Sequence, residues 1–284
     1  MTTPSVSDLK ERERSTWAGA AEGWKRRDEL LTKGAIPVTE RMLALAAVSP
    51  GHHVLDIASG TGEPAISAAH IVGDSGSVTG SDLVEEMLVH AREKAAKANL
   101  NNIAFHCVDG ETLTFTPDTY DVVTIRWGLM FMPEPHVCLA LAYTAMKTGG
   151  RIALACWAAP DENPFLSLLV QTLSKYMEIP KPPPGTPGIF AFADPDRLRN
   201  VIETAGFKNV ELEKLEFNII ELESGLAYWE AMSDLAAPIM LLVNKLDDEQ
   251  RASFVSDVIA AADALKEGDT LRLRGTTWLV SADK

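Results

Sequence analysis

The 284-residue sequence has only three cysteines, Cys107, Cys138 and Cys156, which lie far apart and form no CxxC pair. This scarcity argues against a disulfide framework or a zinc site and is typical of a reducing compartment. No His/Asp/Glu cluster has metal-ligand spacing, so no metal is expected. No apolar run approaches the ~20 residues of a membrane span, and the polar N-terminus lacks the core of a signal peptide. These absences predict a cytoplasmic protein.

Basic residues are also in short supply. Lysine and arginine number 26 against 40 acidic residues, which gives a formal net charge of -14. Such a surface repels phosphate backbones and anionic lipid, so neither nucleic acid nor a membrane surface is expected as a partner. The 46% of hydrophobic residues is ordinary for a globular protein and sufficient for a substantial core.

The middle of the chain alternates apolar runs with amphipathic stretches. Helix candidates at residues 64–72, 84–98 and 134–147 separate the strand candidates. Continuous apolar strands separated by helices indicate a parallel sheet that is covered on both faces. Right-handed crossovers then predict an α/β fold with a doubly wound, Rossmann-like sheet. The strand candidates are residues 53–57, 77–82, 103–108, 121–126 and 151–157.

Residues 54–65 read V-L-D-I-A-S-G-T-G-E-P-A, a glycine-rich turn between a strand and a helix. A tight turn alone would explain the glycines by their tolerance of positive φ. Here Gly60, Gly62 and Ala65 also match the dinucleotide-binding fingerprint. Asp82 lies 20 residues after Gly62, at the end of the next strand, where an acid can accept hydrogen bonds from ribose hydroxyls. These linked signals favour a nucleoside-type cofactor and leave NAD, FAD and S-adenosylmethionine as candidates.

Two further acids distinguish these cofactors. Asp56 ends the first strand, where its carboxylate would repel a pyrophosphate but complements the ammonium group of a methionine moiety, directly or through water. Asp109 follows the third strand and can accept from the adenine amine, while the Gly110 N–H can donate to a ring nitrogen. An Asp-Gly pair is also a common turn. Three acids at one sheet edge nevertheless suit a cationic sulfonium ligand better than a diphosphate.

Five segments follow one another in the order found in class I S-adenosylmethionine-dependent methyltransferases. They are V-L-D-I-A-S-G-T-G-E-P, G-S-D-L-V-E-E-M-L, V-D-G-E-T-L-T-F, D-V-V-T-I-R-W-G-L-M-F-M-P-E-P and M-K-T-G-G-R-I-A-L-A-C-W. Over residues 40–157 the sequence most resembles the UbiE-like (ubiquinone/menaquinone-biosynthesis-type) branch. The resemblance implies S-adenosylmethionine as cofactor and a seventh, antiparallel strand, for which residues 271–282 are the candidate. Ala58 stands where many relatives place a glycine, but alanine is the smallest replacement, so we expect the turn to survive.

The resemblance also implies which residues contact the cofactor. They follow the ends of the first four predicted strands. The implied contacts are Asp56, Ala58, Gly60 and Gly62 for the methionine portion, Asp82 for the ribose hydroxyls, Leu83 and Met87 beside the adenine, Asp109 and Gly110 for the adenine edge, and Arg126 for the methionine carboxylate or the acceptor.

Aromatic residues lie after the predicted strands and in the segments outside the sheet. Each one alone is more simply a core residue, but together they indicate an apolar acceptor pocket. In-line methyl transfer requires a positioned acceptor and the exclusion of water, and a general base only if the acceptor loses its proton early. His136 is the candidate base, whereas His106 is expected to be a core histidine. The candidate pocket residues are Trp17, Trp24, Trp127, Phe131, Trp157, Phe192 and Trp229.

Three hypotheses follow from the sequence. The favoured one is an S-adenosylmethionine-dependent methyltransferase that modifies oxygen or carbon of a small, largely apolar or aromatic metabolite. A catalytically silent S-adenosylmethionine-binding protein and an NAD(P)-dependent oxidoreductase are the alternatives. The predicted organisation is an N-terminal helical lid (1–40), a cofactor-binding core (41–157), a lid or acceptor-side insertion (158–192), completion of the core sheet (193–221 and 269–284) and a helical cap insertion (222–268).

Overall fold

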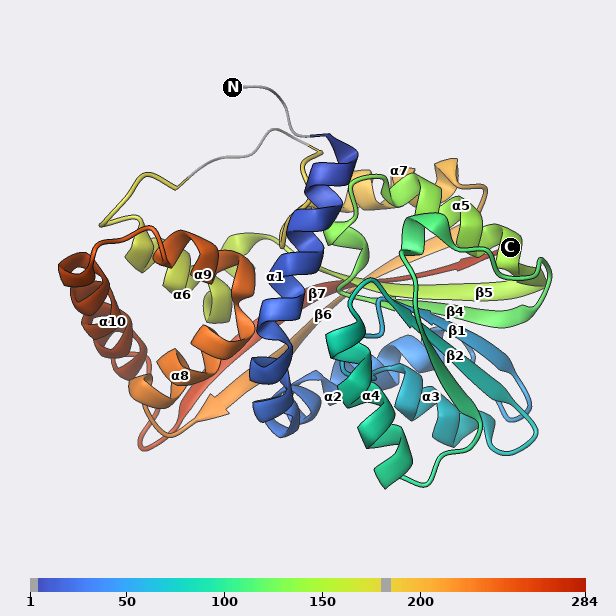
Figure 1. Cartoon of the computed structure of the whole chain (residues 1–284), viewed down its shortest axis with the longest axis horizontal. Coiled ribbons are helices and arrows are strands. Elements are labelled where there is room, and N and C mark those ends of the chain that lie inside the picture. Colours follow the sequence, from blue (N-terminus) through green and yellow to red (C-terminus); the bar gives the residue numbers. More distant parts are fainter. Residues whose placement is uncertain (1–4, 180–184) are drawn as a thin grey trace.

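The computed structural model describes residues 5–179 and 185–284, and these build one seven-stranded sheet (Figure 1). The strand order is β3-β2-β1-β4-β5-β7-β6, and β7 is antiparallel to both of its neighbours. The pairs β1–β2, β1–β4, β2–β3 and β4–β5 are parallel. The predicted fold class, including the antiparallel last strand, is confirmed. The strands are β1 (His53–Ile57), β2 (Ser77–Asp82), β3 (Ile103–Cys107), β4 (Tyr120–Arg126), β5 (Met146–Trp157), β6 (Lys208–Leu222) and β7 (Leu271–Asp283).

Helices cover both faces of this sheet. Three lie on one face: α2 packs against β4 to β7, α3 against β1 and β2, and α4 against β2 and β3 (Figure 1). On the other face α5 packs on β5, and α7 packs on β6 and on α5. Burial on both faces explains the continuous apolar strands. These helices are α2 (Asp28–Leu45), α3 (Ala65–Val72), α4 (Glu85–Lys97), α5 (Pro135–Ala145) and α7 (Pro195–Thr204).

The remaining helices form a lobe beyond β6 and β7, on the left of Figure 1. Within it α10 packs on α8 and α6, and α9 contacts α6 and α8. Between this lobe and α4 runs α1, which contacts both sides. The predicted lid boundary at residue 40 falls inside α2, which packs on the sheet. The helices are α1 (Val6–Arg26), α6 (Pro164–Leu173), α8 (Gly225–Leu235), α9 (Ala237–Val243) and α10 (Asp248–Asp263).

Local signals set several element ends. The helix α7 starts after Asp194, whose side chain accepts from the Asp196 N–H, and Gly206 follows the helix with φ +103°. By contrast, β5 begins at Met146, earlier than predicted, because Met146 pairs with Tyr120 across a register shift in β4. The proline-rich segment 179–188 is described only in part, since residues 180–184 lie outside the described residues.

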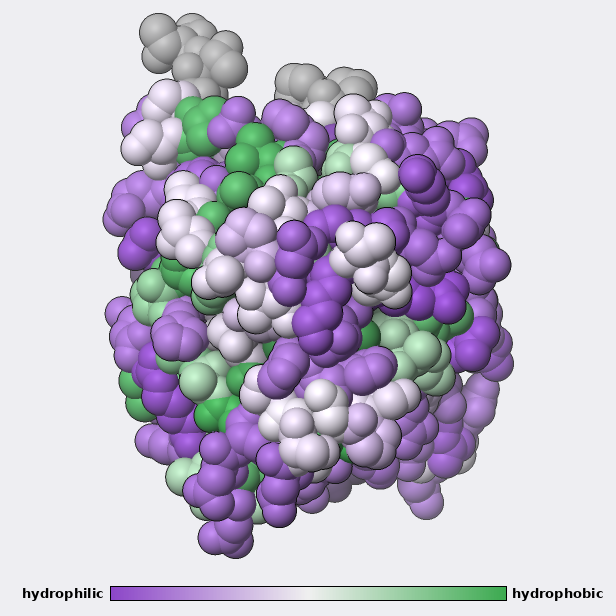
Figure 2. Space-filling view, turned by 90° about the vertical axis from the view of Figure 1, so that its right-hand side faces the viewer, coloured by the Kyte–Doolittle hydropathy of each residue, from purple (hydrophilic) through white to green (hydrophobic). Residues whose placement is uncertain are grey.

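The surface agrees with the composition. The face on the right of Figure 1 carries mainly hydrophilic residues (Figure 2). Within the described residues, no single helix is long and apolar enough to span a membrane. In the described part of the chain, one helix pair, α8 and α9, reaches that length and apolarity when taken together, and it is bent by 101°.

Candidate active site

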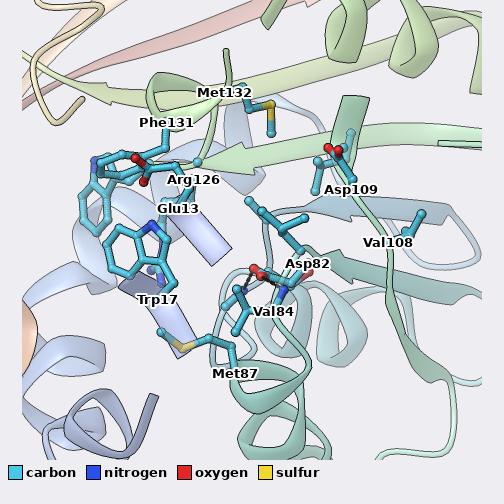
Figure 3. Close-up of a pocket in the computed structure, with 18 of the residues that line it drawn as sticks. Glu13, Trp17, Asp82, Val84, Met87, Val108, Asp109, Arg126, Phe131 and Met132 are labelled. Atoms are coloured by element: carbon cyan, nitrogen blue, oxygen red, sulfur yellow. Dashed lines mark hydrogen bonds between the residues drawn. The ribbon is translucent and has the colours of Figure 1, made fainter. Parts of the chain in front are cut away.

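A cavity opens at the carboxyl-terminal edge of the sheet. Its wall combines the turn after β1 (57–63), the end of β2 (82–84), the loop after β3 (108–111), the loop after β4 (126–133) and the inner face of α1. Figure 3 shows side chains from these segments converging on one space. Ligands of doubly wound sheets bind outside the carboxyl ends of the strands, so we call this space the donor cavity.

The glycine-rich turn is shaped to admit a ligand. Ala58, Gly60 and Gly62 all adopt positive φ, at 58°, 51° and 112°. Gly60 lines the cavity, and a Cβ added there would meet no protein atom within 4 Å. Gly62 does not line it; a Cβ at this position would lie 2.7 Å from Ile66 Cδ1 and 3.3 Å from the backbone of Ala91 on α4. Gly60 therefore leaves room for a ligand, and Gly62 allows the turn to pack closely on α4.

With alanine at position 58 the turn keeps its conformation, as expected, but the Ala58 methyl group occupies space next to Gly128, in the loop after β4. A Cβ built on Gly128 would lie 2.3 Å from the Ala58 Cβ. Both residues line the donor cavity. The methyl group at position 58, in a left-handed conformation that disfavours side chains, is thus accommodated by a glycine in the loop after β4.

Asp82 holds the turn in place. Its Oδ2 accepts from the Gly60 N–H at 2.9 Å, and its Oδ1 accepts from the Val84 N–H at 2.9 Å. Burial raises the pKa of Asp82 to about 6, against the opposing effect of these backbone hydrogen bonds. Each carboxylate oxygen can accept more than one hydrogen bond. Asp82 can therefore fix the turn and still receive hydroxyl donors from a ligand.

Asp109 and Gly110, in the loop after β3, also line the donor cavity. The Asp109 Oδ1 accepts from the Glu111 N–H at 2.8 Å, which caps the short 3-10 helix Gly110–Thr112. Its Oδ2 lies 2.7 Å from the Nζ of Lys10 on α1. Lys10 also pairs with Glu111 at 2.6 Å. Lys10 and Glu111 were not identified from the sequence, and both line the cavity.

Asp56 is placed differently from the other acids. It is fully buried, and it is not among the described residues that line the donor cavity. Its Oδ1 accepts from the Thr124 hydroxyl of β4 at 2.7 Å, and its Oδ2 has no hydrogen-bond partner among the described residues. Burial raises the pKa of Asp56 to about 7. The structure brings Asp82 and Asp109 together around the cavity and leaves Asp56 behind its wall.

Two charged residues of opposite sign lie where β1 and β4 end. Arg126 donates to the Thr39 hydroxyl at 2.7 Å and stands 5.1 Å from the ring centre of Trp127. Burial lowers the pKa of Arg126, while Glu63 is the leading charge that opposes this effect. Glu63 follows the glycine turn directly and accepts from the Ser67 hydroxyl at 2.7 Å. Its position inside G-T-G-E-P was a signal for it that the sequence-based prediction did not use.

The lining charges indicate what kind of ligand fits. Five carboxylates line the donor cavity, against two cationic side chains. A diphosphate would meet net repulsion in such a space, whereas a ligand with a net positive charge is complementary. Gly60 provides the open approach, and Asp82 and Asp109 provide acceptors for hydroxyl and amine donors. The carboxylates are Glu13, Glu63, Asp82, Asp109 and Glu111, and the cations are Lys10 and Arg126.

A second cavity adjoins the first, and we call it the acceptor cavity. Trp157 lies inside it and stacks on Trp127 with 4.2 Å between ring centres and 12° between planes. Phe165 of α6 and Met232 of α8 also line it. The rest of its lining is also largely apolar. The two cavities share Trp17, Trp24, Thr61, Glu63, Arg126, Trp127 and Phe131.

Most of the predicted pocket residues reach these cavities, but two predicted aromatics and the candidate base do not. Phe192 is buried in the core, where the Arg197 guanidinium lies 5.0 Å from its ring centre. Trp229 packs edge-on against Phe254 of α10 at 5.8 Å. His136 is exposed on α5 and is not among the described lining of either cavity, so the structure does not support it as a base. The remaining five predicted aromatics line the acceptor cavity: Trp17, Trp24, Trp127, Phe131 and Trp157.

His106, expected in the core, is exposed because β3 is the edge strand of the sheet. Among the described residues there is no group of three or more His, Cys, Asp or Glu that could hold a metal ion.

The sheet order, the ligand-admitting turn and the carboxylate-lined cavity together define the class I S-adenosylmethionine-dependent methyltransferases. Residues 38–179 match the model of the ubiE/COQ5 methyltransferase family. The chain is 27% identical over 240 residues to the ubiquinone/menaquinone biosynthesis C-methyltransferase UbiE of Teredinibacter turnerae, covering 78% of this chain and 94% of that protein. The chain therefore belongs to the ubiE/COQ5 methyltransferase family.

Solved structures share the fold. A Haemonchus contortus phosphoethanolamine N-methyltransferase 2 with bound S-adenosyl-L-methionine superposes with a TM-score of 0.57 at 17% identity, covering 99% of this chain and 60% of that one. The [4+2]-cyclase SpnF superposes with a TM-score of 0.54 at 16% identity, covering 93% of this chain and 94% of that one. Because a cyclase shares the fold, the fold alone does not fix the reaction. Family membership does: the protein is an S-adenosylmethionine-dependent methyltransferase, which decides against the oxidoreductase and silent-binder alternatives.

Proposed function

We propose that this enzyme transfers the methyl group of S-adenosylmethionine to an oxygen or carbon atom of a small, largely apolar or aromatic metabolite held in the acceptor cavity. The observation that carries this proposal is the wall shared by the two cavities. Trp127 and Phe131 lie on that wall between the carboxylate-lined donor cavity and an apolar space of aromatic residues. An apolar ring can fill the second space without leaving buried polar groups unpaired.

The donor cavity suits the donor in three places. Asp82 would accept the ribose hydroxyls, with Leu83 and Met87 beside the adenine, as the sequence predicts. Asp109 and Gly110 would read the adenine edge. The ribose and adenine ends are thereby fixed by groups that the turn and the loop after β3 already hold in position.

The remaining end of the donor is an amino acid with an ammonium and a carboxylate. Glu63 and Arg126 present opposite charges on the shared wall, so we assign Glu63 to the ammonium and Arg126 to the carboxylate. Asp56, buried behind the turn, would act on this end only through its field. Ala58 and Gly60 would let the backbone approach the methionine portion closely.

When bound, the donor supplies an activated methyl group on a cationic sulfur. The protein then has to align the acceptor atom with that group and exclude water. Trp17 and Trp24 of α1, which line both cavities, and Phe165 and Met232 of the helical lobe enclose the space. In-line transfer requires no general base unless the acceptor must lose a proton early.

The family relatives refine the acceptor. The Teredinibacter turnerae protein is named a C-methyltransferase of ubiquinone/menaquinone biosynthesis. This likeness supports carbon as the methylated atom and quinone-related rings as the first acceptors to test. It also supports a small-molecule partner, in agreement with the acidic composition. We further propose the division into lid, core, insertion and cap segments, with α1 as the lid proper.

The proposal is tested by incubating the enzyme with methyl-labelled S-adenosylmethionine and a panel of phenols, quinones and polyketide-like compounds. Mass spectrometry then identifies the methylated atom. We expect transfer to a compound with an apolar or aromatic ring. Transfer only to RNA, to protein or to highly charged amines would contradict the proposal.

A further inference from the structure

The first helix lies across both cavities with one face. Lys10, Glu13, Trp17 and Trp24 line the donor cavity, and Trp17 and Trp24 also line the acceptor cavity. Spacings of three, four and seven residues place these side chains on one side of a helix. Figure 3 shows Glu13 and Trp17 at the donor cavity, with Met87 beside Trp17. Trp17 packs edge-on against Phe131 with 5.1 Å between ring centres.

The two ends of α1 are held by different partners. At the C-terminal end, Arg26 and Arg27 pair with Asp234 of α8 at 2.6 and 2.8 Å, and the Trp24 N–H donates to the Leu235 carbonyl at 3.3 Å. Gly23 approaches the Asp234 backbone so closely that an added Cβ would lie 2.8 Å from its carbonyl oxygen. This end of α1 is anchored to the cap segment.

At the N-terminal end the attachment is an ion pair with the adenine side of the donor cavity. The Lys10 Nζ lies 2.7 Å from Asp109 and 2.6 Å from Glu111, and the Lys10 and Glu111 side chains are 21% and 1% exposed. Burial disfavours the charged amine, but the hydrogen bonds to Asp109 and Glu111 outweigh it and raise the pKa of Lys10. Lys10 is therefore a cation held between two carboxylates, one of which is expected to read the adenine.

We propose that Lys10 is a positioning residue that fastens α1 over the bound donor, and that this fastening makes the donor bind before the acceptor. With the Lys10 pair broken, α1 can swing from its anchored end and open the donor cavity. With the pair formed, Trp17 and Trp24 complete the acceptor cavity and cover the donor. The donor then enters first, and the demethylated donor leaves only after the methylated product. The binding order depends on the proposed function, because it requires an acceptor in the acceptor cavity. The fastening of α1 by Lys10 concerns only the donor cavity.

The fastening is tested by the dissociation rate of S-adenosylhomocysteine from full-length Lys10→Met, Lys10→Arg and Lys25→Met variants. Stopped-flow tryptophan fluorescence gives the rate, and equilibrium dialysis with labelled S-adenosylmethionine gives the affinity. Lys10→Met should release the ligand about tenfold faster, since loss of one partner of a partly buried pair acts mainly on dissociation. Lys10→Arg keeps the positive charge, so its release rate should stay close to that of the parent enzyme.

Lys25→Met is the matched control, because Lys25 lies on the same helix but forms an exposed pair with Glu93 at 2.8 Å. Its release rate should equal that of the parent enzyme. Thermal unfolding of all variants separates the fastening from a general loss of structure. Lys10→Met with parental release rates would overturn the proposal, as would equal acceleration in Lys25→Met.

The binding order is tested by product inhibition of the parent enzyme with an acceptor found in the panel. S-adenosylhomocysteine should compete with the donor and not with the acceptor, and Lys10→Met should relax this pattern. A random order in the parent enzyme would overturn the ordered step. If no panel compound is methylated while Lys10→Met still releases the ligand faster, the acceptor proposal fails and the fastening stands.

Discussion

The two cavities differ in how the chain builds them. The donor cavity is formed mainly by the loops that directly follow β1 to β4, so its main residues come from consecutive crossover units. The acceptor cavity draws on α1, α2, β5, α6, β6, α8 and α9, and its lining residues span the chain from Trp17 to Pro238. The first depends on local turn chemistry, and the second depends on how distant segments pack. Substituting residues that line only one of the two cavities should therefore distinguish donor binding from acceptor binding.

The two cavities also differ in charge. Carboxylates outnumber cations around the donor cavity, whereas the residues that only the acceptor cavity contributes are largely apolar, apart from the Asp28–Lys94 ion pair at 2.7 Å. A cationic donor and an apolar acceptor would each find a matching environment. The shared wall then has to serve both, so its substitutions should affect donor and acceptor binding together.

The largest effect is expected at Gly128 on the donor side. Gly128→Ala would push a methyl group to 2.3 Å from the Ala58 Cβ and displace the turn that binds the donor. Overpacking of this kind costs up to about 3 kcal/mol of folding stability. Because moving the turn out of its donor-binding position relieves the clash, we expect S-adenosylmethionine to bind up to roughly a hundredfold more weakly. Equilibrium dialysis with labelled donor measures the loss.

The Ala58→Gly variant is the control for this effect. It removes the opposing methyl group and relieves an alanine at φ +58°, so the double variant Ala58→Gly/Gly128→Ala should regain most of the affinity. Equal affinities for Gly128→Ala and the double variant would show that the two methyl groups do not interact. Ala58→Gly alone should unfold at a slightly higher temperature.

Asp109→Ala should weaken donor binding by about 2 kcal/mol, because a donor group on the adenine would lose its buried acceptor. The same change leaves Lys10 with Glu111 as its partner, so the dissociation rate should rise as well. Isothermal titration with S-adenosylhomocysteine gives the affinity. An unchanged affinity would show that the adenine does not bind at this loop.

Met232→Ala is expected to act on the acceptor side alone. Met232 is buried and lines the acceptor cavity but not the donor cavity. Removing its side chain should raise the acceptor KM about tenfold, the equivalent of roughly 1.4 kcal/mol of lost packing. The donor affinity should stay at the parental value. A matching loss of donor affinity would mean that the cavities are not separable.

Asp56→Asn should change the pH dependence of stability by about 1 kcal/mol or more. The pKa of Asp56 is about 7 in the folded protein, above its ordinary value of 3.8. Between these values the folded state holds a proton that the unfolded state has lost, so the free energy of unfolding falls as pH rises through this window. Asparagine cannot ionise and can still accept from Thr124, so the variant should be the more stable protein at pH 8. Urea unfolding of the variant and the parent protein at pH 4 and pH 8 checks this. If the variant's gain in unfolding free energy is no larger at pH 8 than at pH 4, Asp56 does not cause the pH dependence.

Some site residues could be located from the sequence, and others could not. Gly60, Asp82 and Asp109 were found because strand, turn and helix boundaries fix their places at one sheet edge. Asp56 was expected near the donor, yet its side chain bonds to Thr124 of the neighbouring strand. The direction of a side chain at a strand end depends on pairing that the pattern does not specify. Phe192 and Trp229 were expected at the acceptor because they are aromatic and lie in segments outside the predicted sheet, and both pack elsewhere.

The sequence by itself determined the parallel sheet and the acidic donor edge, because hydrophobic periodicity and turn residues act over a few positions, while its resemblance to a known family implied the antiparallel last strand. Only the tertiary structure decided that α1 lies over both cavities, that Lys10 meets Asp109 from 99 residues away, and that Ala58 faces Gly128. Such contacts arise when helices settle against one another to bury their apolar faces, and the resulting angles depend on the packing of the whole core.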